Sequence, residues 1–181
     1  MAQMGIGKLG APNVIMKRKF RWTMEISTPC GYVPPHYCKT GARPNIDIDE
    51  VELNFLNGVT WIPGKGKWQP ITVTYYDVAQ FEMSGLLSWI NTVYQFTDPV
   101  NLKMSEKPGW AGTALLTLYD GCGKPLEFWL LQDCFPQSVN WGDLDMASSD
   151  ICELEITLRY SKVMYASACG GVQIQNCCRG C

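Results

Sequence analysis

The chain has 181 residues, 46% of them hydrophobic and 18% charged, so it can bury one globular core without the help of cross-links. Its formal net charge of −2 argues against a surface built to bind nucleic acid, but not against a protein that merely encloses it. No apolar run reaches the roughly 18 residues of a membrane-spanning helix, and the first residues lack the pattern of a secretory signal. We therefore expect synthesis in a cytoplasm and no membrane insertion.

The N-terminal quarter contains one clear strand between two irregular segments. Residues 1–16 show no hydrophobic periodicity and predict an arm without a core. From Arg18 to Ser27 apolar and polar residues alternate, which predicts a half-buried strand. Residues 28–44 hold four of the eleven prolines and predict an excursion loop without strand or helix.

A projecting, tryptophan-rich segment is expected next. Strand character returns from Asn45 to Phe55 with a change in the parity of the apolar residues, which predicts a bulge near Asp49. Residues 57–70 mix tryptophan with Gly, Pro and Lys, a segment too long for a tight hairpin and too aromatic for a plain linker. We interpret it as a contact device. Its candidate contact residues are Trp61, Pro63, Lys65, Lys67 and Trp68.

The second half of the chain combines one helix with further strands. Residues 71–75 alternate as a strand, and residues 82–96 predict an amphipathic helix. The apolar stripe of that helix is Met83, Leu86, Leu87, Ile90 and Tyr94. Residues 113–119 and 126–133 predict a hairpin around an Asp-Gly turn, and residues 142–150 form a polar loop.

The run ICELEITLRY, residues 151–160, alternates most cleanly. Cys152, Leu154, Ile156, Leu158 and Tyr160 lie on one side, which makes Cys152 a buried free thiol. The other side carries Glu153, Glu155, Thr157 and Arg159. Together these segments predict a mainly β fold, an antiparallel sandwich or barrel of two sheets with one flanking α-helix.

Catalytic chemistry is poorly represented. The single histidine, His36, lies in the proline-rich loop, which removes most mechanisms that depend on imidazole. No phosphate-binding glycine motif occurs, and the acidic runs do not have calcium-loop spacing. We assign no catalytic residue, cofactor or metal, and expect a protein that is not an enzyme.

Nine cysteines are many for a cytoplasmic protein, and an odd number leaves at least one sulfur free or paired with another chain. Four of them lie in the last thirteen residues. Cys178 and Cys181 form one CxxC motif, which could serve a zinc site or a redox pair, but no second ligand pair is present and the motif ends the chain. A cysteine-tipped tail can instead reach a neighbouring subunit and form a disulfide.

Residues 134–163, CFPQSVNWGDLDMASSDICELEITLRYSKV, resemble the tail tube protein of contractile-tailed bacteriophages. The stretches KFRWTMEI and RPNIDIDEVELNFLNGVTWIPGKGKWQPITVTYYD, and the helix followed by a Tyr-Asp-Gly hairpin, resemble the same family in the same order. The likeness covers about residues 17–163. It implies two antiparallel sheets and a helix per subunit, six subunits closing a ring with a continuous inner β-barrel, and rings stacked into a hollow tube through which the genome passes.

The resemblance also implies a domain division, partners and a location. It divides the chain into an N-terminal arm (1–16), a tail-tube domain (17–163) and a cysteine-rich C-terminal extension (164–181). The implied partners are further copies of the chain, the tail sheath protein, the baseplate and tail terminator proteins, and the tape measure protein during assembly. Double-stranded DNA would pass without specific binding. The location is the virion tail, assembled in the host cytoplasm.

Particular residues receive roles from the resemblance. The contact residues of segment 57–70 and the arm would bridge successive rings, and the polar face of residues 153–159 is a candidate for the lumen. The cysteines depart from the family pattern, and we expect them to cross-link subunits after lysis. The candidates are Cys169, Cys177, Cys178, Cys181, Cys30, Cys38 and Cys122.

Three other functions remain open at this point. The same architecture could form the inner tube of a type VI secretion or phage-like contractile injection system, which carries proteins. A thiol oxidoreductase could use Cys178 and Cys181. A secreted, disulfide-rich binding module is disfavoured because the first residues lack a secretory signal pattern and because the chain can bury a sufficient core without disulfides.

Overall fold

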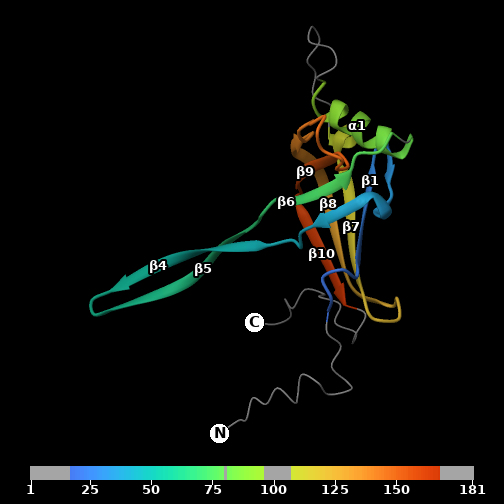
Figure 1. Cartoon of the computed structure of the whole chain (residues 1–181). Coiled ribbons are helices and arrows are strands. Elements are labelled where there is room, and N and C mark those ends of the chain that lie inside the picture. Colours follow the sequence, from blue (N-terminus) through green and yellow to red (C-terminus); the bar gives the residue numbers. More distant parts are fainter. Residues whose placement is uncertain (1–16, 80, 96–106, 168–181) are drawn as a thin grey trace.

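The computed structural model describes residues 17–79, 81–95 and 107–167 (Figure 1). Within these ranges the protein is mainly β, as predicted, with one long helix. The strands are β1 (Trp22–Thr28), β2 (Gly31–Val33), β3 (Cys38–Gly41), β4 (Ile46–Phe55), β5 (Gly58–Trp68), β6 (Ile71–Tyr76), β7 (Gly112–Tyr119), β8 (Pro125–Asn140), β9 (Glu153–Arg159) and β10 (Lys162–Ser167). The helices are α1 (Phe81–Val93), the four-residue α2 (Lys107–Trp110) and a 3₁₀ turn, η2 (Pro35–Tyr37).

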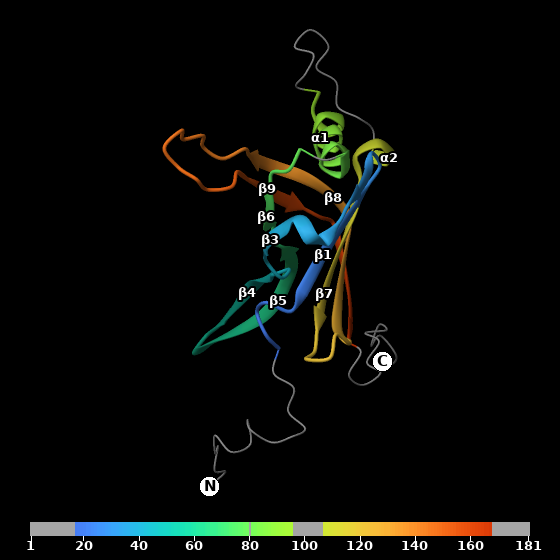
Figure 2. The ribbon, with the colours of Figure 1, turned by 45° about the vertical axis from the view of Figure 1, so that its right-hand side comes forward.

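Eight strands form one antiparallel sheet that β8 divides into two halves (Figure 2). The first part of β8 lies between β7 and β10, and this β7 half continues through β1 to β2. The second part of β8 pairs with β9, and this β9 half continues through β6 to β3. One long strand therefore belongs to both layers. Strands β4 and β5 form a separate two-stranded sheet that projects from this body (Figure 1).

Strand β8 passes from one half to the other at Asp133. Gly112 pairs with Cys134 and Thr113 with Gln132, so Asp133 is an extra residue on β8. It has φ 55°, in the left-handed region that Asp tolerates better than most residues. Strands commonly change sheets at such bulges, because the extra residue bends the strand and increases its twist.

The core lies between the two halves. Met24 and Ile26 of β1 and Leu131 of β8 contribute from the β7 half, and Val73 and Ile156 contribute from the β9 half; all five are fully buried. The alternation predicted for residues 71–75 and for Leu154, Ile156 and Leu158 is confirmed, because these apolar side chains are buried. Each buried Leu or Ile contributes about 1.5–3 kcal/mol relative to exposure.

Helix α1 covers one end of the core with a face that agrees only in part with the predicted one. Leu86, Trp89 and Ile90 are buried, whereas Leu87 and Tyr94 are exposed. The predicted stripe was wrong at Leu87 and Tyr94, because the i, i+3, i+4 spacing from Leu86 selects Trp89 and Ile90. The side chain of Met83 lies outside the described residues.

Two other predictions are corrected by the pairing of strands. Residues 28–44 are not strand-free, because β2 pairs with β1 and β3 pairs with β6 on either side of the η2 turn. Both are short strands at sheet edges, where nearby prolines are tolerated. The 126–133 strand runs on to Asn140 through Pro136, which is tolerated because β8 pairs there only with β9. Strand β10 crosses the domain boundary predicted at residue 163, and that division stays a prediction.

Gly112 makes room for the indole of Trp89. A Cβ at Gly112 would lie 2.9 Å from Trp89 Cζ2 and 3.2 Å from the carbonyl oxygen of Ser27. Trp89 is fully buried, and its Nε1 donates a hydrogen bond to the carbonyl oxygen of Trp110 at 2.6 Å. The indole therefore has little freedom to move away.

We predict that Gly112→Ala lowers the free energy of unfolding by about 1–3 kcal/mol, because it overpacks the contact between α1 and the sheet. Urea unfolding followed by circular dichroism measures the change. Gly58→Ala is the matched control, since a Cβ there meets no atom within 4 Å. Equal stability of the two variants would contradict the prediction.

Candidate functional site

The β4–β5 hairpin exposes large apolar side chains that nothing in the described chain covers. All ten residues of β4 and all but the last of β5 are exposed. Phe55 is 65% exposed, Trp61 56% and Leu56 fully exposed. A two-stranded hairpin alone is only marginally stable in water, and an apolar surface of this kind marks a contact site. The expectation of a projecting hairpin is thus confirmed.

The hairpin is tighter than the sequence suggested. Phe55 pairs with Gly58, so the loop contains only Leu56 and Asn57, and the segment whose length and composition argued against a tight hairpin forms strand β5. That prediction was wrong because the glycines and proline of β5 lie in a two-stranded sheet, where each strand has a free edge that tolerates them.

The predicted bulge near Asp49 is confirmed. Ile48 pairs with Gly66 and Glu50 with Pro63, so Asp49 faces two residues of β5. The facing residues are Gly64 and Lys65. A Cβ at Gly64 would lie 2.9 Å from the Asp49 carbonyl oxygen, which explains the glycine at this position.

The two faces of the outer hairpin differ in chemistry. Cross-strand partners lie on the same face of an antiparallel pair, and successive residues point to opposite faces. Val51, Leu53, Phe55 and Ile62 therefore share one face, which we call the apolar face. The opposite face carries Glu50, Glu52, Trp61 and Pro63, and we call it the acidic face.

Gln69 and Tyr160 attach the base of the hairpin to the body. The Tyr160 hydroxyl donates to the backbone carbonyl oxygen of Gln69 at 2.6 Å. The backbone N–H of Gln69 donates to the backbone carbonyl oxygen of Asn45 at 2.9 Å. The Trp68 ring packs against the Tyr160 ring with centroids 6.2 Å apart. The base is held by these contacts, while the outer half is free to meet another molecule.

The residues predicted to stack rings all lie on β5, in different surroundings. Trp61 and Pro63 are exposed on the acidic face, and Lys65 lies in the bulge. Lys67 forms an ion pair with Asp49 at 2.8 Å. Trp68 is half-buried at the base, so it acts as an anchor of the hairpin more than as an outward contact. Their role in stacking stays a prediction.

The β9 half presents a polar outer face, which contains the predicted lumen residues. Glu155 is exposed, and Glu153, Thr157 and Arg159 are half-buried. The cross-strand neighbours of the two central residues are also polar, because Glu155 pairs with Thr74 and Asn140, and Thr157 pairs with Thr72 and Ser138. Lys39 of β3 forms an ion pair with Glu153. One polar surface therefore extends across β3, β6, β9 and β8.

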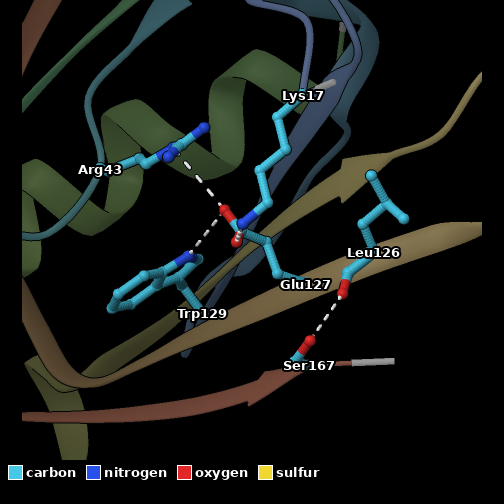
Figure 3. A network of polar contacts seen from close by, with 6 residues as sticks. All are labelled: Lys17, Arg43, Leu126, Glu127, Trp129 and Ser167. Carbon is cyan, nitrogen blue, oxygen red and sulfur yellow. Dashed lines mark hydrogen bonds and ion pairs between the residues drawn. The ribbon is translucent and has the colours of Figure 1, made fainter. Parts of the chain in front are cut away.

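Glu127 forms a buried ionic centre at the start of β8 (Figure 3). Its side chain is only 2% exposed, and Lys17 Nζ donates to its Oε2. Arg43 Nε lies 3.7 Å from Oε1, and Trp129 Nε1 donates to Oε1 at 3.4 Å. Next to it, the Ser167 hydroxyl donates to the Leu126 carbonyl oxygen. Glu127 thus joins the first described residue, the segment before β4 and the end of β10.

The surroundings of Glu127 favour its charged form. Burial by itself raises the pKa of Glu127, but the hydrogen bonds from Lys17 and Trp129 and the charges of Lys17 and Arg43 outweigh burial. The pKa is therefore lowered from its ordinary value of 4.5. A buried carboxylate with this many donors acts as a tether for segments that are remote in sequence.

The cysteines of the described chain fall into two groups. Cys30, Cys122 and Cys152 are exposed, whereas Cys38 is half-buried and Cys134 is buried; all five are free thiols. Burial raises the pKa of the Cys38 and Cys134 thiols to about 12. The four cysteines of the C-terminal tail lie outside the described residues.

The prediction of a buried Cys152 was wrong. The alternation of residues 151–160 placed it on the apolar face, but β9 begins at Glu153 and Cys152 is exposed. The backbone of Cys152 still contacts the residue that follows β6, since its carbonyl oxygen accepts a hydrogen bond from the Asp77 backbone N–H at 2.9 Å. The chain has already turned into the polar loop at this point, so the period of two no longer sets side-chain direction.

The body also carries a cleft of about 530 Å³ beside β1 and β7. Its residues include Arg18, Lys19, Trp22, Arg43, Leu116 and Leu118.

Within residues 17–79, 81–95 and 107–167, no group of three or more His, Cys, Asp or Glu side chains could hold a metal ion. No helix in the same ranges is long and apolar enough to cross a membrane.

No family model and no curated protein matches the sequence. Among solved structures, a chain of the PVC sheath–tube complex of an extracellular contractile injection system aligns with TM-score 0.62 and 21% identity, over 90% of this chain and 98% of that one. A chain of the tube-terminating cap of the anti-feeding prophage aligns with TM-score 0.64 and 19% identity, over 93% and 100%. A chain of the PVC sheath/tube terminator aligns with TM-score 0.61 and 22% identity, over 83% and 96%.

The chain therefore has the fold found in the tube and terminator assemblies of contractile injection systems. At these identities the likeness concerns the fold. The resemblance to tail tube proteins that the sequence suggested is confirmed at that level, as is the predicted pair of antiparallel sheets with one flanking helix.

We predict that Glu127→Gln lowers the free energy of unfolding by about 1–3 kcal/mol at pH 7, because charged hydrogen bonds are lost in a buried site. Since the folded pKa is below 4.5, the carboxylate stabilises the fold fully above that pH, and its contribution is lost as the pH falls through the folded pKa. Urea unfolding of both proteins between pH 7 and pH 3 tests this dependence. Glu155→Gln, an exposed carboxylate on β9, is the control. A difference that stays constant with pH would contradict the assignment.

Proposed function

We propose that this chain is the subunit of the inner tube of a contractile machine and that it acts as a structural conduit. The observation that carries the proposal is the unpartnered apolar hairpin on a body with the fold of tube and terminator assemblies. Exposed side chains such as Leu53, Phe55 and Trp61 require a covering surface, and a second copy of the chain supplies one in a closed assembly.

Free strand edges support closure into a ring. Among the described strands, β3 pairs only with β6, and residues 135–140 of β8 pair only with β9. Each copy therefore offers two unpaired edges at opposite sides of the β9 half. Pairing β3 of one copy with β8 of the next would satisfy both edges and extend the β9 halves into a continuous barrel. Six copies per ring is the number that the resemblance to tail tubes implies.

The polar outer face of the β9 half supports its placement in the lumen. Thr72, Thr157 and Glu155 present hydroxyls and a carboxylate, and the Lys39–Glu153 ion pair adds no net charge. A polar wall of this kind is hydrated. It has no excess of positively charged side chains that would bind phosphates through counterion release. Cargo would pass along it without specific binding.

Two machines fit this conduit. In a contractile phage tail, the tube would deliver the genome, with sheath, baseplate, terminator and tape measure proteins as partners and the virion as location. In a phage-like contractile injection system, the tube would carry proteins; this alternative is favoured by the fold likeness to chains of the PVC sheath–tube complex and the anti-feeding prophage. The sequence resemblance to tail tubes over residues 17–163 leads us to propose the phage tail first.

Disulfides between subunits would strengthen the tube after it reaches an oxidising environment. Cys30 and Cys122 are exposed candidates for partners of the tail cysteines, residues 169, 177, 178 and 181. Cys38 is the weakest candidate, because burial raises its pKa to about 12 and the thiolate is the reactive form. A cross-link between chains also makes dissociation kinetically slow.

We predict that the purified full-length protein forms rings that stack into tubes in negative-stain electron microscopy. Leu53→Thr/Phe55→Thr should reduce the number of stacked rings at least about tenfold, since burial of two large apolar side chains is lost at each contact while strand propensity is kept. Asn54→Thr, on the opposite face of the same strand, is the control. A wild-type protein that remains monomeric would overturn the proposed function.

We predict that oxidised tubes give a ladder of cross-linked subunits in denaturing gels run without reductant. The combined Cys30→Ser/Cys122→Ser variant should weaken that ladder, whereas Cys38→Ser should leave it unchanged, because the Cys38 thiolate is scarce near neutral pH. Reductant should abolish the ladder in every case. Monomer bands from oxidised wild-type tubes would exclude the cross-links and leave the tube itself unaffected.

A further inference from the structure

The acidic face of the hairpin carries two carboxylates without a counter-charge. Glu50 and Glu52 are both exposed and stand across from Pro63 and Trp61. Neither forms an ion pair with another described residue, in contrast to Asp49, which pairs with Lys67. Trp61, across from Glu52, is 56% exposed, so the face combines an aromatic side chain with two negative charges.

The cleft beside β1 and β7 has the complementary composition. Arg18 and Lys19 line it and are exposed, and neither forms an ion pair within the described part of the chain. Its floor includes the half-buried Trp22 and the buried Leu116 and Leu118. A volume of about 530 Å³ is in the range that holds a small organic group. The cleft therefore combines the apolar side chains of Trp22, Leu116 and Leu118 with positive charges at Arg18 and Lys19.

The acidic face cannot reach the cleft of its own chain. Among the described strands, β4 and β5 pair only with each other, and the hairpin projects away from the body (Figures 1 and 2). Its base is held to the body through Gln69 and Tyr160. An acidic face that enters this cleft must then come from another molecule, and a second copy of the chain carries a face of complementary charge.

We propose that the acidic face of one copy docks into the basic cleft of a neighbouring copy, with Trp61 over the apolar floor and Glu50 and Glu52 against Arg18 and Lys19. This inference rests on the proposed function, since it assigns a contact within the assembly. Face and cleft are different surfaces of one chain, so the contact is heterologous and closes a ring or continues along a tube. Charge complementarity fixes its orientation and rejects wrong registers.

Charge reversal tests the contact in full-length protein. Variant one is Glu50→Lys/Glu52→Lys, and variant two is Arg18→Glu/Lys19→Glu. Each alone should raise the protein concentration for half-assembly at least about tenfold, because like charges then meet at every contact. Sedimentation velocity and negative-stain microscopy measure assembly. Arg43 is left unchanged because it lies beside Glu127.

An equimolar mixture of the two variants should restore assembly to within about threefold of wild type. The reversed face of variant one meets the reversed cleft of variant two, and the unreversed face of variant two meets the unreversed cleft of variant one, so alternating copies satisfy every contact. Lys162→Glu, which reverses an exposed charge on β10 outside both the acidic face and the cleft lining, is the control and should assemble normally.

Circular dichroism verifies that both variants are folded, which is expected because all four positions are exposed. The inference is overturned if either variant assembles like wild type, or if the folded variants fail to assemble when mixed. Both results leave the proposed function intact, provided that wild-type protein forms tubes. A wild-type protein that never assembles overturns the proposed function and this contact with it.

Discussion

The structure depends on one strand that belongs to two layers. β8 pairs with β7 and β10 over its first part and with β9 over its second part, and the bulge at Asp133 turns it from one to the other. Because Leu131 precedes the bulge and Cys134 follows it, and both are buried, the bend keeps one side of the strand on the core while its direction changes. Two sheets connected only by loops could shift against each other, whereas these halves are fixed in register by continuous backbone.

Because the body is well packed, the apolar side chains and strand edges that its surface leaves uncovered are informative about assembly. The core buries its apolar residues completely, yet the hairpin exposes Phe55, Leu56 and Trp61, and among the described strands the β9 half has unpaired edges at both sides. In a monomer each of these is a hazard, since bare edges and apolar patches promote uncontrolled association. In a closed assembly the same features are satisfied between identical copies. The ion pairs around Glu127 fit this division, because they tie the segments leading to the arm and to the hairpin onto the rigid part.

The local alternation of apolar and polar residues predicted much of the fold. It could not predict contacts between segments that are distant in the sequence. The strand at residues 71–75 and the bulge near Asp49 could be predicted because their patterns are contained in a few neighbouring residues. Cys152 was misplaced because a period of two cannot show where a strand begins. Glu127 gave no signal at all, since a glutamate in a strand ordinarily faces water, and its partner Lys17 is 110 residues away. Composition was enough to predict a projecting segment, whereas the separation of the hairpin into an apolar and an acidic face required the register.

The two faces of the hairpin suit different tasks. In the proposed assembly, apolar contact through residues such as Phe55 would supply most of the attraction, but it is non-directional and would hold copies in several registers. The proposed charged contact through Glu50 and Glu52 would add little net attraction once desolvation is counted, yet like charges in a wrong register are costly. A tube would need both, because many identical contacts must be strong in sum and unique in geometry. A hairpin with an apolar face for attraction and an acidic face for selecting the correct register would meet this requirement with a single projecting element.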